Sequence, residues 1–303
     1  MSTIASPRST RFGLAAALFA YFCWGFLPLY WRPIQQVPAL EILAHRIAWS
    51  MGFLVVLLTA RRQWAWLGPA LRRPRVLGVF ALSAALLSMN WFLYIWAVNA
   101  GQVVEASLGY FINPMVNLLL GRLVLKERLR GAQLLAVGLA FAGVAWLTLS
   151  LGAPPWISLT LAISFGLYGL LRKVAPLGSL EGLTLETLIM AVPAVAFLAW
   201  REWATVERGH FGHDGLFTTS MLLAAGVVTA VPLLAFATAA RTLPLSVMGV
   251  VQYLSPTLQF LIGVLVFHEP FARSKLVGFG FIWAALLIFG LEGLWVGRRQ
   301  RAP

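Results

Sequence analysis

The sequence predicts an all-α membrane protein with ten transmembrane helices, arranged as two inverted repeats of five helices each. Three observations predict this class: the composition, a series of long apolar runs, and a residue pattern that recurs at a fixed offset. Of the 303 residues, 60% are hydrophobic and 11% are charged, whereas a soluble domain has about 45–50% apolar and about 25% charged residues. One globule cannot bury that much apolar surface, so much of it is expected to face lipid.

The apolar runs define the individual helices. A helix that crosses the hydrocarbon core of a bilayer needs about 20 mostly apolar residues. Ten such segments follow one another along the chain: 12–31, 39–60, 76–98, 103–124, 131–150, 156–172, 182–200, 219–241, 245–267 and 275–295. The first follows Arg8 and Arg11, but it is too long for the h-region of a signal peptide and lacks a small-residue cleavage site, so we expect a retained span. The longest connection, residues 201–218, is hydrophilic and glycine-rich.

The basic residues predict the orientation. If the N-terminus lies in the cytoplasm and ten spans alternate, Arg46 falls inside a span, and the basic residues of the outside connections are Arg32, Arg201, Arg208, Arg273 and Lys275. The remaining Lys and Arg residues lie on the cytoplasmic side, which predicts that both termini are cytoplasmic. Membrane topology thus explains the formal net charge of +13, and we expect no nucleic-acid partner.

A pattern that repeats at an offset of 142 residues predicts an internal duplication. The pairs related by this offset are Pro114 and Pro256, Gly121 and Gly263, Glu127 and Glu269, and Gly138 and Gly280. The same offset relates the third span to the eighth, so each repeat has five helices, at residues 1–150 and 151–303. Because five is odd, the two repeats cross the bilayer in opposite directions. Transporters built in this way bind their substrate near mid-membrane, between the repeats.

Longer stretches resemble a known family. The Pro, Gly, Glu and Gly pattern in each half resembles the repeat of the EamA branch of the drug/metabolite transporter superfamily. Four stretches are similar to the RarD group of this branch, which is associated with chloramphenicol sensitivity: "YFCWGFLPLYWR", "EILAHRIAWS", "NWFLYIWAVNAGQVVEASLGYFINPMVNLLLG" and "SFGLYGLLRK". The resemblance covers nearly the whole chain. It implies a ten-helix fold and transport of a small molecule, but no particular substrate and no catalytic residues.

Three ionisable residues stand at the head of the second span, in "EILAHRIAWS". Glu41 and His45 are four residues apart on one helix face, so they can pair. An arginine at the depth of Arg46 costs about 2.5–3.5 kcal/mol on insertion scales, so we expect Arg46 to face protein or water with a partner, either Glu41 or Glu105. The alternative is that Arg46 extends to the outer headgroups and that Glu41 is merely interfacial.

A second charged group is expected toward the cytoplasmic face. Glu186 lies about one turn into the seventh span, and Arg172 and Lys173 end the sixth span on the same side. One charged cluster toward each face is consistent with two gates around a central cavity, with Glu41, His45, Arg46, Glu105, Arg172 and Glu186 as gating or proton-coupling candidates. Glu41, His45 and Arg46 are also candidates for the substrate-binding lining of that cavity. The alternative is two independent ion pairs that fix helix packing.

Polar and aromatic side chains at helical spacing predict the cavity lining. The candidates on the fourth and ninth spans are Tyr110, Asn113, Asn117, Gln252, Tyr253 and Gln259. Their amides and hydroxyls suit a polar organic substrate, and Pro114 and Pro256 can kink the two helices. The alternative for the polar residues is hydrogen bonding between helices, worth about 0.6 kcal/mol on average.

Aromatic candidates for the same cavity are Trp24, Trp91, Tyr94 and Tyr168, together with Tyr21. Their rings can stack on a drug or metabolite while their polar edges form hydrogen bonds. The alternative for each is a lipid-facing or interfacial position.

Other polar residues and several glycines are interpreted as structural. Glu127 and Glu269 precede the fifth and tenth spans and are expected to cap those helices. Close helix contact is expected at Gly131, Gly138, Gly143, Gly278 and Gly280. His210 and His213 are expected to be solvated loop residues, with a metal site beside Asp214 as the alternative. The single cysteine, Cys23, excludes a multi-cysteine metal site, and we expect no metal and no cofactor.

The leading functional prediction is a secondary transporter of the inner (cytoplasmic) membrane. It would export or exchange a small polar or amphipathic metabolite or drug by alternating access, with a small-molecule substrate and the lipid bilayer as its partners. No phosphate-loop motif is present to bind ATP. The alternatives are a polytopic membrane enzyme, although His45 is the only histidine within a span, and a non-transporting receptor or assembly protein. The apolar surfaces do not predict an oligomeric state.

Overall fold

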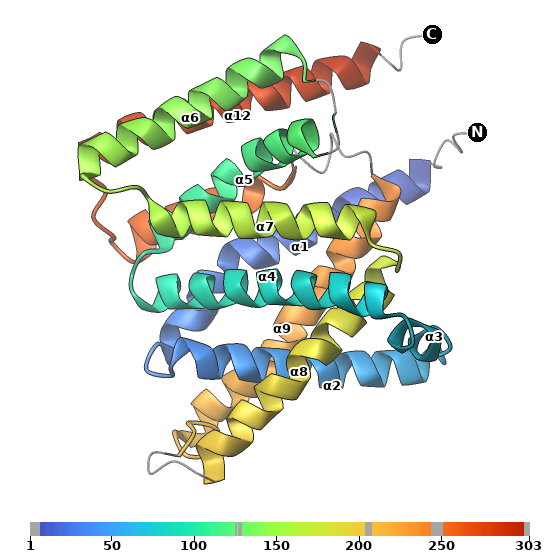
Figure 1. Cartoon of the computed structure of the whole chain (residues 1–303). Coiled ribbons are helices and arrows are strands. Elements are labelled where there is room, and N and C mark those ends of the chain that lie inside the picture. The colour runs from blue at the N-terminus through green and yellow to red at the C-terminus, as the bar shows by residue number, and fades with distance from the viewer. Residues whose placement is uncertain (1–6, 125, 127–128, 204–207, 244–250, 300–303) are drawn as a thin grey trace.

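The computed structural model describes residues 7–124, 126, 129–203, 208–243 and 251–299. This part of the chain is helical and contains no strand (Figure 1). Its elements are α1 (Pro7–Trp31), η1 (Arg32–Ile34), α2 (Ala39–Ala60), α3 (Leu67–Leu71), α4 (Pro74–Asn99), α5 (Val103–Leu123), α6 (Gly131–Leu151), α7 (Trp156–Val174), α8 (Ser179–Trp203), α9 (Gly215–Thr242), α11 (Leu254–Leu261), the π-helical turn η2 (Ile262–Val266) and α12 (Arg273–Arg299).

The length and composition of these helices confirm an all-α membrane protein. Eight of the described helices are long and apolar enough to cross a membrane. Two further predicted spans correspond to the shorter apolar helices Trp156–Arg172 and Leu254–Val266. The ninth predicted span, 245–267, begins outside the described residues. The total of ten spans therefore stays a prediction.

Local chemistry explains several helix ends. Pro74 stands at the first position of α4, where its missing N–H would have had no helical partner and its fixed φ suits a helix. Gly152 ends α6 with a φ of 72°, a left-handed conformation that glycine adopts without strain. Pro114 lies inside α5, as expected for a kink. Pro256, by contrast, lies in the first turn of α11, where a proline interrupts no helical hydrogen bond.

The helices pack into one bundle in which segments far apart in the sequence are neighbours. α6 lies alongside α12, and α7 packs against both α4 and α5, whereas α1 and α2 both contact α9, and α2 also contacts α8 (Figure 1). The largest buried cluster joins residues of α1, α2, α4, α5, α7, α8 and α9. The first turn of α1 and the last turn of α12 lie at the same end of the bundle, the right-hand end in Figure 1.

Some glycines are in close helix contacts, and others are not. A Cβ added at Gly143 would lie 2.8 Å from the carbonyl oxygen of Gly278, and one at Gly278 would overlap Leu147, so the expected α6–α12 approach is confirmed at this pair. At Gly131, Gly138 and Gly280 a Cβ would meet nothing within 4 Å. The expectation of close contact at those three positions is wrong, because they face open space.

The closest approach in the central part of the bundle is between α2 and α9. A Cβ at Gly226 would overlap the backbone of Trp49, and the adjacent Ser50 hydroxyl donates a 3.3 Å hydrogen bond to the Gly226 carbonyl. Because backbone atoms cannot rotate away as a side-chain end does, this crossing depends on the absence of a side chain.

We predict that Gly226→Ala destabilises the protein and that Gly280→Ala does not. The added methyl at Gly226 forces the α2 and α9 backbones apart, which costs about 1–3 kcal/mol by analogy with other overpacked cores. At Gly280 the methyl enters open space and improves helix propensity by up to about 1 kcal/mol. Thermal unfolding of both purified variants, followed by tryptophan fluorescence, measures the difference. Equal melting temperatures for the two variants would contradict the packing described here.

Candidate functional site

A buried arginine lies where α1, α2, α4 and α9 meet. The Arg46 side chain is 3% exposed. Its Nε donates a 2.7 Å hydrogen bond to Oγ1 of Thr229 in α9. Its guanidinium carbon lies 4.0 Å from the ring centroid of Trp91 in α4 and 5.7 Å from that of Trp31 in α1. The indole rings attract the cation and shield it from lipid.

Two tyrosines complete this environment. The rings of Tyr94 and Tyr110 meet edge to face with centroids 5.8 Å apart, and both phenols lie within electrostatic range of Arg46. Six residues together form the Arg46 site: Trp31, Arg46, Trp91, Tyr94, Tyr110 and Thr229.

A row of aromatic rings continues from the Arg46 site toward α7. The Tyr110 ring contacts Phe165 with centroids 6.2 Å apart, and Phe165 contacts Tyr168 at 5.7 Å. The Tyr168 hydroxyl then donates a 3.4 Å hydrogen bond to Oε2 of Glu186 in α8. The predicted cavity residues Arg46, Tyr110 and Tyr168 thus belong to one continuous structure.

The Glu186 cluster, named for Ser83, Tyr168, Arg172 and Glu186, joins α4, α7 and α8. Glu186 is completely buried. Its carboxylate accepts a hydrogen bond from the Ser83 hydroxyl and lies 3.6 Å from Nη1 of Arg172. The Arg172 guanidinium also lies 5.4 Å from the centroid of the Phe80 ring. The structure therefore brings the predicted Arg172 and Glu186 together.

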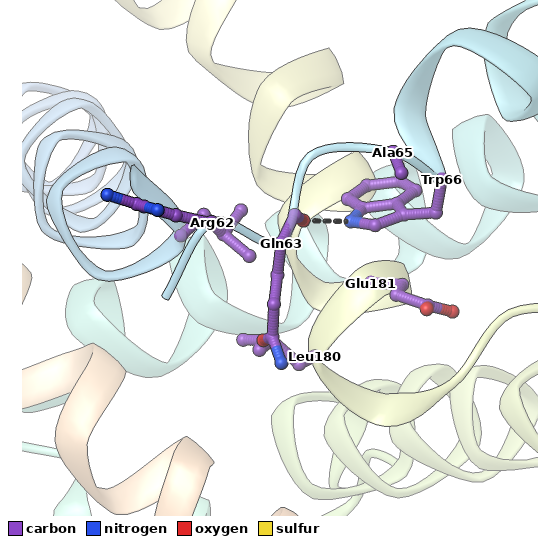
Figure 2. Close-up of a pocket in the computed structure, with 7 residues that line it drawn as sticks. Arg62, Gln63, Ala65, Trp66, Leu180 and Glu181 are labelled. Atoms are coloured by element: carbon purple, nitrogen blue, oxygen red, sulfur yellow. Dashed lines mark hydrogen bonds between the residues drawn. The ribbon is translucent and has the colours of Figure 1, made fainter. Parts of the chain in front are cut away.

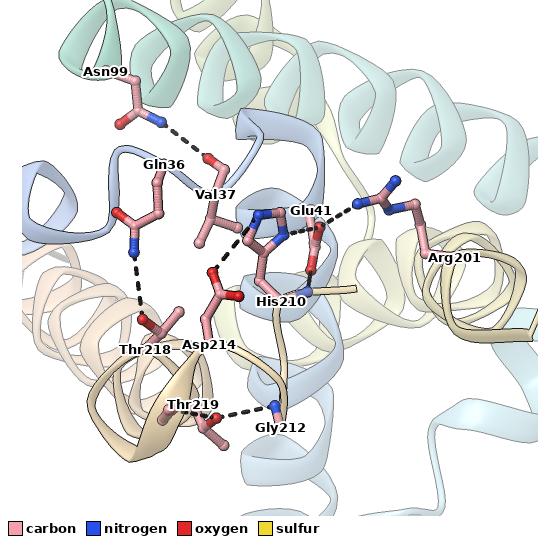
Figure 3. Close-up of polar contacts among 11 residues, drawn as sticks. Gln36, Val37, Glu41, Asn99, Arg201, His210, Gly212, Asp214, Thr218 and Thr219 are labelled. Atoms are coloured by element: carbon pink, nitrogen blue, oxygen red, sulfur yellow. Dashed lines mark hydrogen bonds and ion pairs between the residues drawn. The ribbon is translucent and has the colours of Figure 1, made fainter. Parts of the chain in front are cut away.

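Figure 3 shows the Glu41 cluster, named for Glu41, Arg201 and His210. Arg201 lies in the last turn of α8, toward the end opposite to Glu186. Glu41 is completely buried. Its carboxylate accepts hydrogen bonds from the backbone N–H of His210, at 2.6 Å, and from Nη2 of Arg201, at 3.4 Å. Nδ1 of His210 lies 2.9 Å from Oε2 of the same carboxylate. The Glu41 carboxylate thus connects the start of α2 with the end of α8 and with the segment at His210.

The segment around His210 folds over the start of α2 instead of remaining in solvent. The Phe211 ring stacks on His45, with centroids 5.0 Å apart, and also contacts Trp49 at 5.8 Å. Nearby, the Gln36 amide donates to Oγ1 of Thr218 (Figure 3). The expectation that His210 is a solvated loop residue is therefore wrong, because its side chain and its backbone N–H both bind Glu41.

The expected partners within "EILAHRIAWS" differ from those that the structure shows. Glu41 binds His210 and Arg201 and makes no hydrogen bond to His45, whose Nδ1 is buried without a partner among the described residues. Neither Glu41 nor Glu105 forms an ion pair with Arg46. Glu41 is already occupied, and Glu105 lies half-buried in the first turn of α5, near Lys275.

Two of the predicted amide candidates, Asn113 and Gln259, join helices. The Asn113 amide donates to the carbonyl of Ala162 in α7, and the exposed Asn117 donates to Asn113. The Gln259 amide donates to the carbonyl of Trp24 in α1. The Asn113 and Gln259 contacts match the interhelical alternative considered from the sequence, whereas the bond between Asn117 and Asn113 lies within α5.

Three other candidates have surroundings of their own. Gln252 lies in the turn before α11, and the Tyr253 hydroxyl is buried without a partner among the described residues. The Trp24 ring packs against Tyr21 and Phe236 between α1 and α9.

Glu269 caps a helix, but not the one that was expected. Its two carboxylate oxygens accept hydrogen bonds from the backbone N–H groups of Val103 and Val104, at 2.7 and 2.8 Å. It therefore caps α5, whereas it had been assigned to the tenth span, which begins at Arg273. Burial raises the pKa of the Glu269 carboxyl, and the two N–H groups oppose this shift. The matching expectation for Glu127 falls outside the described residues.

A cavity of about 440 Å³ opens at the end of α2 and shares no residue with the Arg46 site (Figure 2). Its lining is Leu58, Arg62, Gln63, Ala65, Trp66, Leu180 and Glu181. Trp66 is held there by a 2.9 Å hydrogen bond from its Nε1 to the Gln63 carbonyl. Within the described residues, no group of three or more His, Cys, Asp or Glu side chains could hold a metal ion.

The sequence did not predict Thr229 as a residue of the Arg46 site, or Asn90 as a hydrogen-bond partner of Tyr110. Thr229 is a single hydroxyl in a long apolar run, and Asn90 precedes Trp91 in a predicted span. The Asn90 amide donates to the Leu161 carbonyl and to the Ser164 hydroxyl, and its carbonyl accepts from Tyr110. A polar side chain within an apolar span was the only available signal, and it does not specify a partner.

Comparisons with known proteins agree with this architecture. The chain matches the EamA-like transporter family over residues 11–149 and again over 155–291. Protein RarD of Streptomyces exfoliatus is 47% identical to it over 297 residues, which cover 98% of this chain and 94% of that protein. Protein RarD of Escherichia coli is 44% identical and covers 96% of this chain and 98% of its own length.

Two further relatives are informative. The uncharacterized transporter YojE of Bacillus subtilis is 46% identical, over 92% of this chain and 94% of that protein. A solved crystal structure of a protein superposes with a TM-score of 0.61 at 17% identity, covering 93% of this chain and 98% of that chain. This similarity shows a shared fold.

We predict that Glu269→Ala destabilises the protein by about 0.5–2 kcal/mol, because losing a helix cap leaves N–H groups of α5 without acceptors. Glu202→Ala serves as the matched control, since Glu202 pairs with His213 and both side chains are more than a third exposed, where ion pairs are worth about 0–1 kcal/mol. Thermal unfolding of the two purified variants tests this. A larger loss for Glu202→Ala would contradict the assigned cap.

Proposed function

Because this chain belongs to the EamA-like transporter family and is of the RarD type within it, we propose that it is a secondary transporter that works by alternating access. It is a multi-pass membrane transporter. The proposed cargo is a small polar or amphipathic metabolite or drug, exported or exchanged across the inner (cytoplasmic) membrane. The transporter names of its relatives agree with a non-enzymatic role.

The observation that carries this proposal is the arrangement of charge along α8. The Glu41 and Glu186 clusters lie near its two ends, and both carboxylates are fully buried. Arg201 and Glu186 are 15 residues apart on this helix, which corresponds to roughly 22 Å at 1.5 Å per residue. At the Arg46 site, Tyr110 is half-buried and the other five residues are buried. This arrangement supports an occluded state with a closed gate at each end.

Charged pairs suit such gates. When a gate is open, water hydrates its ions, and when it is closed, the ions pair with each other and with hydrogen-bond donors. Loss of hydration and gain of pairing largely cancel for buried ion pairs, so the two states have similar free energies and a substrate can shift the population between them.

The packing supports the proposed repeats, 1–150 and 151–303, and the two family matches at 11–149 and 155–291 do so as well. Asn113 of α5 binds a carbonyl of α7, and Gln259 of α11 binds a carbonyl of α1. In an inverted repeat of five helices, the fourth and sixth spans correspond to the ninth and first, so an amide joins the equivalent pair of helices in each half, although Asn113 and Gln259 are not at equivalent positions.

Close contacts at two glycines relate the same two pairs of helices, α5 with α7 and α11 with α1. A Cβ at Gly166 of α7 would lie 2.7 Å from Val116 of α5, and one at Gly25 of α1 would lie 2.7 Å from Leu258 of α11. Val116 and Leu258 are separated by the repeat offset of 142 residues. Both termini are proposed to be cytoplasmic, which agrees with the common end of α1 and α12 (Figure 1).

We predict that purified protein in liposomes mediates flux of at least one solute from a panel of amino acids, nucleosides and drugs. Radiotracer uptake with and without a pH gradient measures both transport and proton coupling. Empty liposomes are the control. No flux above that control for the whole panel would contradict the proposed function.

We also predict that Glu41→Ala opens the proposed gate formed by the Glu41 cluster. The removal leaves Arg201 and His210 without their shared acceptor, so a cysteine introduced at Ser50, one turn beyond Arg46, should react faster with a polar thiol reagent added from outside. The expected increase is at least about fivefold, which corresponds to a bias of about 1 kcal/mol. All variants carry Cys23→Ser. Glu202→Ala is the control, and an unchanged rate in the Glu41→Ala protein would refute the gate.

A further inference from the structure

The positive charge of Arg46 has no compensating negative charge among the residues that the structure describes. The side chain is 3% exposed and forms no ion pair with a described carboxylate. Its Nη1 is buried and makes no hydrogen bond among the described residues. The Glu41 and Glu186 carboxylates, by contrast, each have their own partners. A buried charge without an oppositely charged partner is strongly unfavourable, so the contacts with Thr229 and the indole rings do not by themselves explain Arg46 as a packing residue.

The unused groups around Arg46 are mainly hydrogen-bond donors. The centroid of the Trp31 ring lies 5.7 Å from the guanidinium carbon. Nε1 of this ring and the Tyr94 hydroxyl are both buried without a partner in the described part of the chain. An indole N–H and a guanidinium can only donate, and a phenol can donate as well. Three unpaired donors at one site fit a ligand that supplies acceptors.

The geometry of the guanidinium limits where such a ligand binds. One face is covered by the Trp91 ring, 4.0 Å away, and Nε is used by Thr229. The edge carrying Nη1 is the part that lacks a partner. A guanidinium edge pairs in plane with a carboxylate or a phosphate. Because one uncompensated positive charge balances one negative charge, a monoanionic carboxylate fits better than a phosphate dianion.

We propose that the transported substrate is a carboxylate with a flat apolar part. The carboxylate binds the Nη1 edge of Arg46, with Trp31 and Tyr94 as further donors, and the apolar part packs against the rings of Trp91 and Tyr110. This proposal rests on the proposed transport function and specifies its substrate class.

The same charge balance links binding to the occluded state. An empty closed site contains an unpaired cation, whereas a loaded closed site contains a neutral ion pair. Closure of both gates is therefore more favourable with the substrate bound, which is the differential affinity that a carrier requires.

Matched acid and amide pairs test the proposal by thermal stabilisation of the purified protein. The probes are benzoate and benzamide, indole-3-acetate and indole-3-acetamide, and N-acetylphenylalanine and its amide, with phenyl phosphate as the phosphate probe. At least one acid should raise the melting temperature, with its amide binding about tenfold more weakly or not at all. Arg46→Gln should abolish the shift, and Arg46→Lys, which keeps the charge but loses the planar edge, should weaken binding about tenfold.

Arg130→Gln, at a half-exposed surface pair with Glu292, is the matched control and should retain the shift. Equal binding of acid and amide, retained binding by Arg46→Gln, preferred binding of phenyl phosphate, or no binding of any acid would each overturn the proposal. If liposomes transport only neutral or cationic solutes, the substrate class is wrong and the transport function stands. If they transport nothing, the transport function itself fails.

Discussion

The account depends on one guanidinium held inside a bundle that lies in lipid. Arg46 cannot be solvated by hydrocarbon, so the protein surrounds it with indole rings, a threonine hydroxyl and two phenols. Those groups shield the charge without neutralising it. A soluble protein would place such a residue at its surface, whereas here the surface is apolar and the charge is kept at the junction of four helices. The rest of the structure determines when that junction is open to water.

The Glu41 and Glu186 carboxylates, on either side of the Arg46 site, are held by different kinds of contact. Glu41 draws together the start of α2, the end of α8 and the segment at His210, so several elements would have to separate for its end to open. Glu186 is held by Arg172 and by hydroxyls of Ser83 and Tyr168 within the helices themselves. Tyr168 also belongs to the aromatic row that reaches the Arg46 site. A change at the Glu186 end therefore has a direct packing route to the centre.

The sequence was informative about features that depend on local pattern. Apolar runs located the helices to within a few residues, and the depth of Arg46 in its span indicated that it needs protein contacts. The contacts themselves depend on which helices are neighbours, and a local pattern does not contain that information. The acceptor of the Arg46 hydrogen bond is 183 residues away in the chain, and the helix capped by Glu269 begins 166 residues before it.

The sequence did not predict the contacts of two kinds of polar residue: a loop histidine and amides on helices. His210 stands in a hydrophilic, glycine-rich connection, which usually indicates solvent, yet it folds back onto Glu41 because that buried acid needs donors. Likewise, Asn113 and Gln259 follow the helical spacing of a cavity lining, but their amides bind backbone carbonyls of neighbouring helices. Periodicity identifies a polar face and does not distinguish a face toward substrate from a face toward another helix.

The central claim is that the two ends open in turn around a common site. Spin-label distances measured across the Glu41 end and across the Glu186 end of the same protein in liposomes test it most directly. The account predicts two populations in which one distance lengthens while the other stays short, and a doubly closed population that grows when substrate is added. Both distances lengthening together, or a single population insensitive to every transported solute, would contradict it.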